Sequence, residues 1–267
     1  MGVGQTEVAG ATGVSNPDTS ASTAVATSRD WIKLLAGLAA VFGLFQLLGQ
    51  MLGSDRGQAG VLVAGAVVAA LLVVEWLLFR QAPSQALRSL GFGWPVLRGV
   101  LAALCVSLVL LAVIPIHAAL GGTSLAAYPE WLWALPGLFA QAGIAEEALF
   151  RGYLFRRVRQ GRSFWHAAAL ATLPFVLVHL ILFATLPWPV ALAAVLLSVV
   201  LSFPLARLFE LGGNTIWGPA LLHFTVQGAI KVLELPGDTN LPLVWMAASA
   251  AIPCVALLSI WCPDRRR

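Results

Sequence analysis

Long apolar stretches recur along this chain, and short polar breaks separate them. A helix needs about 20 apolar residues to cross the ~30 Å hydrocarbon layer of a membrane. The stretches that meet this length lie near residues 31–53, 60–79, 99–120, 131–150, 164–186, 188–206, 214–232 and 241–262. The pattern predicts an all-α fold, a membrane bundle of about eight transmembrane helices.

The chain before the first apolar stretch has a different character. Residues 1–28 are rich in Ala, Ser, Thr and Gly and contain no apolar run. Such a segment cannot bury enough apolar surface to offset the entropy of ordering it. We expect a disordered N-terminal tail at 1–28 and a single transmembrane domain at 29–267.

Composition supports a multi-pass protein of the cell membrane, in contact with membrane lipid. Hydrophobic residues make up 59% of the chain and charged residues only 10%. The mean hydropathy of +0.87 lies far outside the range of soluble proteins. No basic stretch with interleaved aromatic residues is present, so the net charge of +4 does not indicate nucleic-acid binding.

The basic residues predict the orientation of the bundle, because cytoplasmic flanks of membrane helices are enriched in Lys and Arg. With eight spans and both termini in the cytoplasm, only Arg56 and Lys231 of the 16 basic residues fall on outer loops. The bias therefore agrees with cytoplasmic N- and C-termini.

Ionisable residues inside apolar segments are costly and mark function by default. Glu75 stands near the cytoplasmic end of its predicted helix, where snorkelling to the interface accounts for it. His117 lies near an outer helix end, where we expect it to be solvated. The remaining candidates are Glu146, Glu147, His179 and His223.

Helical spacing divides these candidates into pairs. Glu147 and Arg151 are four residues apart and can pair, whereas Glu146 points about 100° away from Glu147. One glutamate is then neutralised, and the other is left to act as a general base near neutral pH. The pairs Phe175 with His179 and His223 with Gln227 have the same spacing, so each helix presents a pair to a shared cavity.

Together these residues form a hydrolytic set, and the sequence around them resembles a known family. The stretches EEALFRG at 146–152, FVLVH at 175–179 and GNTIWGPALLHFTVQ at 213–227 resemble the motifs EExxxR, FxxxH and HxxxN or HxxxD of the CPBP family. These are the CAAX protease and bacteriocin-processing enzymes, also called Abi or type II CAAX prenyl endopeptidase-like proteins. The resemblance covers about residues 88–232.

The resemblance implies an intramembrane endopeptidase of the CAAX prenyl protease type. Glu146 would activate a water that His179 also holds, and His223 would be the oxyanion partner. Glu147 and Arg151 would shape the site and balance its charge, and Phe175 would pack beside it.

The cofactor, the substrate and the side on which the cavity opens are further expectations. In the favoured scheme, a glutamate activates the water, and no cofactor is assigned. In a metalloprotease scheme, Glu146, His179 and His223 would instead bind zinc. The implied substrate is a protein or peptide, lipidated or membrane-bound. We expect the cavity to open towards the cytoplasmic side, because the arginine cluster at 151–162 follows the glutamates.

One position departs from the family pattern. Gln227 stands where Asn or Asp is expected, and it carries the amide one methylene further from the backbone. Two alternatives stay open: a catalytically inactive scaffold or immunity-type member of the same family, and a proton-coupled transporter. Other intramembrane proteases are disfavoured, because the chain has no HExxH motif, GTSL at 122–125 is not GxSG, and PGD at 236–238 lacks the GxGD pattern.

Overall fold

The computed structural model describes residues 27–52 and 57–260. In chain order, its elements are α1 Ser28–Met51, α2 Gln58–Phe79, α3 Pro83–Ser89, α4 Leu97–Gly121, β1 Ala126–Ala127, α5 Trp131–Leu138, the π-helices η1 Phe139–Ala145 and η2 Ala148–Phe155, α6 Arg156–Arg159, α7 Phe164–His179, α8 Leu182–Thr185, α9 Trp188–Leu211, α10 Trp217–Val232, β2 Leu233–Glu234, α11 Leu241–Cys254 and the π-helix η3 Val255–Ile260. The two short strands pair antiparallel, with Ala126 opposite Glu234.

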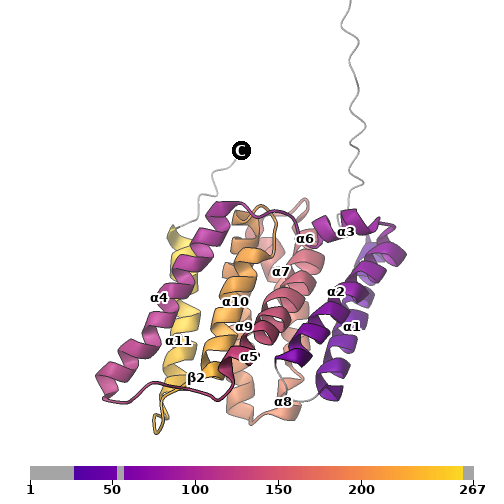
Figure 1. Ribbon diagram of the computed structural model, residues 1–267. Coiled ribbons are helices and arrows are strands. Elements are labelled where there is room, and N and C mark those ends of the chain that lie inside the picture. Colours follow the sequence, from indigo (N-terminus) through magenta and orange to yellow (C-terminus); the bar gives the residue numbers. More distant parts are fainter. Residues whose placement is uncertain (1–26, 53–56, 261–267) are drawn as a thin grey trace, which may run out of the picture.

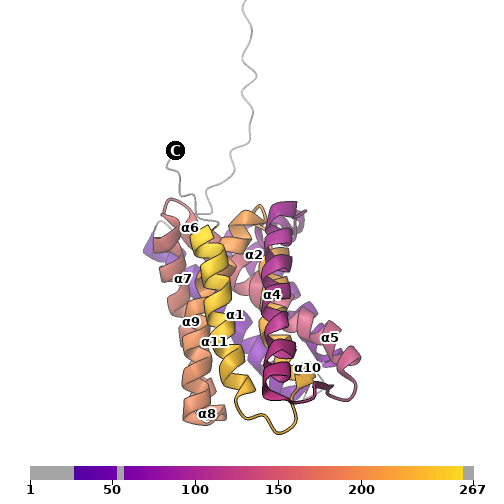
Figure 2. The ribbon, with the colours of Figure 1, turned by 90° about the vertical axis from the view of Figure 1, so that its left-hand side faces the viewer.

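The long helices stand side by side as one bundle (Figures 1 and 2). The short helices α3 and α6 lie at one end, which we call the α3–α6 end, and α8 and β2 lie at the other, the α8–β2 end (Figure 1). The beginning of α1 and the end of η3 both lie at the α3–α6 end. The residues at 1–26, where the sequence predicts a disordered tail, lie outside the described part of the chain.

The all-α, multi-pass character is confirmed. Among the described residues, six helices are long and apolar enough to cross a membrane: Ser28–Met51, Gln58–Phe79, Leu97–Gly121, Phe164–Thr185, Trp188–Leu211 and Leu241–Leu258. The apolar stretch at 131–150 is instead a run of α- and π-helix from α5 to α6, and the stretch at 214–232 becomes the 16-residue α10. The count of eight spans and the cytoplasmic orientation of the termini stay predictions.

Exposed tryptophans mark both ends of the bundle. At the α3–α6 end these are Trp76, Trp94 and Trp165, and at the α8–β2 end they are Trp131, Trp133 and Trp188. Tryptophan is enriched at both membrane–water interfaces, because its ring is apolar and its N–H is polar. The two groups therefore fit the two edges of one bilayer.

Glu75 does not reach out of the bundle, and the prediction that it snorkels is wrong. Its side chain is fully buried and forms an ion pair with Arg157, which is also buried. The Arg157 guanidinium carbon lies 4.0 Å from the centroid of the Phe79 ring and 4.7 Å from that of Tyr153. A partner 82 residues along the chain neutralises Glu75, so the pair fastens α2 to α6 inside the bundle.

His117 also has a partner that the sequence did not reveal. Its Nε2 lies 2.7 Å from Oδ2 of Asp238, and its side chain is only 22% exposed. Asp238 stands in the loop before α11 and accepts hydrogen bonds from the backbone N–H groups of Asn240 and Leu241. The Asn240 N–H makes the largest contribution to lowering the pKa of Asp238. His117 is therefore half-buried and paired, where solvation was expected.

Gly152 sets how closely the chain after the two glutamates approaches α3. A Cβ at this position would lie 2.1 Å from the backbone oxygen of Leu90. Helices in membranes pack closely where a small residue lets the backbones approach. Gly152 thus allows η2 to rest on the end of α3.

We expect Gly152→Ala to lower the thermal unfolding midpoint of the protein in detergent, because the added methyl group collides with backbone that cannot turn away. Overpacking of this kind costs about 1–3 kcal/mol. Gly65→Ala is the matched control, since a Cβ at Gly65 meets no atom within 4 Å. Equal midpoints for the two variants would contradict the proposed role of the close contact.

Candidate active site

The two adjacent glutamates stand at the junction of two π-helices. Glu146 and Glu147 follow η1 and precede η2. Such π-helical turns are rare and often occur at functional sites. Gly143, in η1, would place a Cβ 3.0 Å from the backbone oxygen of Ala220. Its lack of a side chain brings α10, and with it His223, close to the glutamates.

Glu147 connects two elements of the site. Its side chain is 0% exposed, and Oε1 accepts a hydrogen bond from Nη1 of Arg151 at 3.0 Å. The pairing of Glu147 with Arg151 is therefore confirmed. The same Oε1 lies 2.6 Å from Nδ1 of His223. A carboxylate only accepts hydrogen bonds, so Nδ1 carries the hydrogen and donates it to Glu147.

Glu146 is placed differently from its neighbour. Within the described part of the chain, its carboxylate makes no direct hydrogen bond, and Oε2 lies 3.7 Å from Nε2 of His223. Its side chain is 14% exposed and lines a cavity. Oε1 of Glu147 thus has two partners inside the bundle, whereas Glu146 keeps acceptor capacity on the cavity side, as the spacing predicted.

His179 is the last residue of α7 and faces the same cavity. Its Nδ1 lies 2.7 Å from the backbone oxygen of Phe175. A carbonyl only accepts, so Nδ1 carries the hydrogen, and Nε2 is left as an acceptor. The His179 ring packs against the Phe175 ring with centroids 4.4 Å apart, and Phe175 in turn packs edge-on against Phe150.

Gln227 contacts the other nitrogen of His223. The amide Nε2 of Gln227 lies 2.8 Å from Nε2 of His223. Since Nδ1 of His223 donates to Glu147, its Nε2 has a lone pair that accepts from the amide. Both ring nitrogens of His223 are therefore engaged.

The cavity that these residues share has a volume of about 470 Å³. Its polar lining includes Glu146, His179, His223, Gln227 and Lys231. The rest of the wall is largely aliphatic and aromatic, and examples are Phe42, Phe45, Val178, Leu197, Leu201 and Val226. A mostly apolar pocket with a few convergent polar groups is typical of a binding site.

The cavity extends away from the arginine cluster. Its exposed lining residues, Ile181, Leu186 and Ile230, lie near the α8–β2 end, whereas Leu149 and Leu205 at its other end are buried. The exposed part of the lining thus lies away from the arginine cluster, and the expectation that the cavity opens towards the cytoplasmic side stays a prediction. Spacing along the sequence does not reveal which parts of α7, α9 and α10 line the cavity.

The donor atoms do not fit a zinc site. In the ranges 27–52 and 57–260, no group of three or more His, Cys, Asp or Glu side chains is arranged to hold a metal ion. Nδ1 of His179 and both ring nitrogens of His223 already have partners. The residues present therefore favour hydrolysis by the protein's own side chains.

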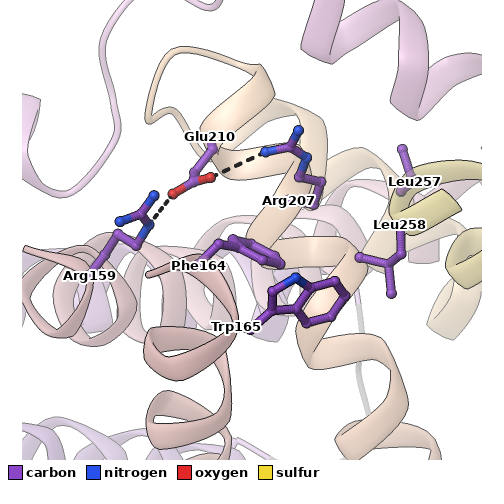
Figure 3. A pocket seen from close by; sticks show the side chains of 7 residues that line it. All are labelled: Arg159, Phe164, Trp165, Arg207, Glu210, Leu257 and Leu258. Carbon is purple, nitrogen blue, oxygen red and sulfur yellow. Dashed lines mark hydrogen bonds and ion pairs between the residues drawn. The ribbon is translucent and has the colours of Figure 1, made fainter. Parts of the chain in front are cut away.

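A second pocket, at the α3–α6 end, is lined by an ion-pair network that links helices (Figure 3). The carboxylate of Glu210 lies between Arg159 and Arg207, with Nη1 of Arg207 at 3.4 Å. Phe164, Trp165, Leu257 and Leu258 form the remaining wall (Figure 3). Its volume of about 30 Å³ accommodates little more than a water molecule. This ion-pair network connects α6 to α9 and provides no candidate base for catalysis.

The fold and the cavity define a polytopic membrane protein with a Glu–His site inside the bundle. Residues 128–229 match the family model of type II CAAX prenyl endopeptidase Rce1-like proteins. The chain therefore contains a domain of this family, the CPBP family that the three motifs resemble. No curated protein matches the chain. The matched segment runs from before α5 into α10 and includes Glu146, Glu147, His179, His223 and Gln227.

Like Gln46 and Ser198, Lys231 is a polar residue of the cavity wall that the sequence analysis missed. It had been placed on an outer loop, but it lies in the last turn of α10 and lines the cavity. The spacing of four residues from Gln227 is the signal that could have found it. It lies outside the segment matched by the family model.

The two glutamates should respond differently to the same substitution. We expect Glu147→Gln to destabilise the protein by about 3 kcal/mol, because it leaves Arg151 buried without a negative partner. Glu146→Gln should change stability by less than about 0.5 kcal/mol, because Glu146 has no comparable contact. Thermal unfolding in detergent, followed by tryptophan fluorescence, measures both. Equal losses would contradict the division of roles between the two side chains.

Proposed function

We propose that the chain is an intramembrane endopeptidase in which Glu146 is the general base. The observation that carries this proposal is the carboxylate of Glu146, which faces the cavity without a direct hydrogen bond from the described residues, while Oε1 of its neighbour Glu147 accepts from both Arg151 and His223. A general base must keep an acceptor position for the proton it removes. The match of residues 128–229 to the family model supports a peptidase activity.

The first step is the orientation of a water molecule. The water donates one hydrogen to the carboxylate of Glu146 and the other to Nε2 of His179, whose Nδ1–H is held by the carbonyl of Phe175. Glu146 then takes its proton as the water oxygen attacks the scissile carbonyl carbon. A new C–O bond forms, and the electron pair of the carbonyl π bond moves onto the oxygen.

The resulting oxyanion requires a hydrogen-bond donor. The sequence pattern proposed His223, but its only N–H is directed at Glu147. The carboxamide of Gln227 has two N–H groups, and one of them is directed at His223. The second N–H is the donor that we assign to the oxyanion.

The tetrahedral intermediate then collapses. The electron pair returns to the carbonyl, the C–N bond breaks, and Glu146 transfers its proton to the departing nitrogen. The products are a carboxylic acid and an amine, and Glu146 is again a carboxylate. Glu147 and Arg151 act by holding His223, and through it Gln227, against the cavity.

The walls of the cavity favour an apolar substrate segment. Leu, Val, Ile and Phe side chains dominate its lining, so a membrane-embedded or lipidated protein or peptide fits it better than a polar one. A CAAX-type prenylated peptide is the first substrate to test.

Glu146→Ala should abolish cleavage while the protein stays folded and inserted, because loss of a positioned base costs about 10²–10⁴ in rate. The assay uses a farnesylated CAAX peptide with a fluorophore and a quencher, together with a comparison of membrane-protein fragments in cells that express each form. Glu130→Gln is the control, since Glu130 is exposed and lies outside the cavity.

Full activity of Glu146→Ala would overturn the assignment of the base. If the wild-type protein and Glu146→Ala give the same fragments in cells and neither cleaves the peptide, the scaffold alternative replaces the proposal.

A further inference from the structure

Lys231 belongs to the same polar chain as the proposed oxyanion donor. It lies one turn beyond Gln227 on α10, and its Nζ donates to Oε1 of Gln227 at 3.3 Å. Gln227 in turn contacts His223, which contacts Glu147, which contacts Arg151. A continuous chain of hydrogen bonds thus runs from a cation in η2 to a cation at the end of α10.

Each contact in this chain has only one possible direction. Guanidinium and ammonium groups can only donate, and a carboxylate can only accept. Arg151 and Nδ1–H of His223 therefore both donate to Glu147, which leaves Nε2 of His223 as an acceptor. At the other end, Lys231 donates to Oε1 of Gln227, so the amide nitrogen faces His223.

A carboxamide without such a constraint has two orientations. In the first, Nε2 of Gln227 faces His223 and presents its second hydrogen to the cavity. In the second, Oε1 takes that place and presents lone pairs, which would repel a developing oxyanion. An ammonium group next to Gln227 is compatible with only the first orientation, because the second would bring two donors together.

We propose that Lys231 is a positioning residue, which fixes the orientation of the Gln227 carboxamide so that an N–H faces the oxyanion. The longer side chain at this position is part of the arrangement, because the Gln227 amide spans between His223 and Lys231. The inference rests on the proposed function, in which Gln227 stabilises the oxyanion. It adds a residue that lies outside the segment matched by the family model.

The first test reads the geometry without using activity. The chain has only four histidines, so ¹⁵N-histidine NMR of the protein in nanodiscs can assign the His223 signals by comparison with a His223→Gln variant. The wild-type protein should show the Nδ1–H form of His223. Lys231→Met should shift part of the population to forms with a hydrogen on Nε2, and Lys231→Arg, which retains a donor, should restore the wild-type signal. An unchanged spectrum in Lys231→Met would overturn the proposal.

The second test uses a double-mutant cycle on the farnesylated CAAX peptide. Gln227→Met should lower kcat by about 100-fold, as expected for loss of one oxyanion donor, and Lys231→Met by about 10-fold, with KM changed less than about twofold in each. If Lys231 acts through Gln227, the double variant should be no slower than Gln227→Met alone. Additive losses would overturn the proposal, because Lys231 would then act independently of the amide.

The two tests separate this inference from the proposed function. A Lys231-dependent His223 spectrum in a wild-type protein that cleaves neither the peptide nor a cellular substrate would support the positioning role and contradict the endopeptidase. Cleavage by the wild-type protein together with a Lys231-independent spectrum would support the endopeptidase and contradict the positioning role.

Discussion

The buried carboxylate of Glu147 is the interaction on which the site depends. One oxygen atom accepts from Arg151 in η2 and from His223 in α10, so a single group holds together two segments about 75 residues apart in the chain. An ionised carboxylate inside a membrane bundle is costly unless its charge is balanced and its lone pairs are used. Arg151 balances the charge, and Oε1 uses its lone pairs on Arg151 and His223, whereas Oε2 is buried and has no hydrogen-bond partner in the described part of the chain. The two bonds also determine which nitrogen of His223 carries the hydrogen.

The pair of neighbouring glutamates shows how backbone geometry separates two identical groups. Glu147 points into the bundle, whereas Glu146 points into the cavity. The π-helices on either side of the pair alter the usual helical spacing, and Gly143 and Gly152 allow this segment to lie against α10 and α3. The local chain therefore has close packing on two sides and an open cavity on the third. This difference in surroundings holds Glu147 against Arg151 and His223 and leaves Glu146 facing the cavity.

Sequence spacing predicted the contacts that lie within one helix, such as Glu147 with Arg151 and Phe175 beside His179. It also predicted the membrane class, because apolar length is a local property. The contacts between distant segments were not predictable in this way. Glu75 finds Arg157, and His117 finds Asp238, only after the helices have packed. The lining of the cavity has the same origin, since it combines residues of α1, α7, α9 and α10 that are far apart in the chain.

The glutamine that departs from the family pattern, Gln227, accepts a hydrogen bond from Lys231, and this contact bears on its longer side chain. Considered alone, the extra methylene displaces an amide that should be fixed relative to its target. In the folded protein, the amide of Gln227 has His223 on one side and Lys231 on the other, and the two contacts require the same orientation. A side chain whose two polar atoms are both held loses the freedom that its extra methylene would otherwise add. The longer residue and the lysine one turn later are therefore joined in one hydrogen-bonded unit that faces the cavity.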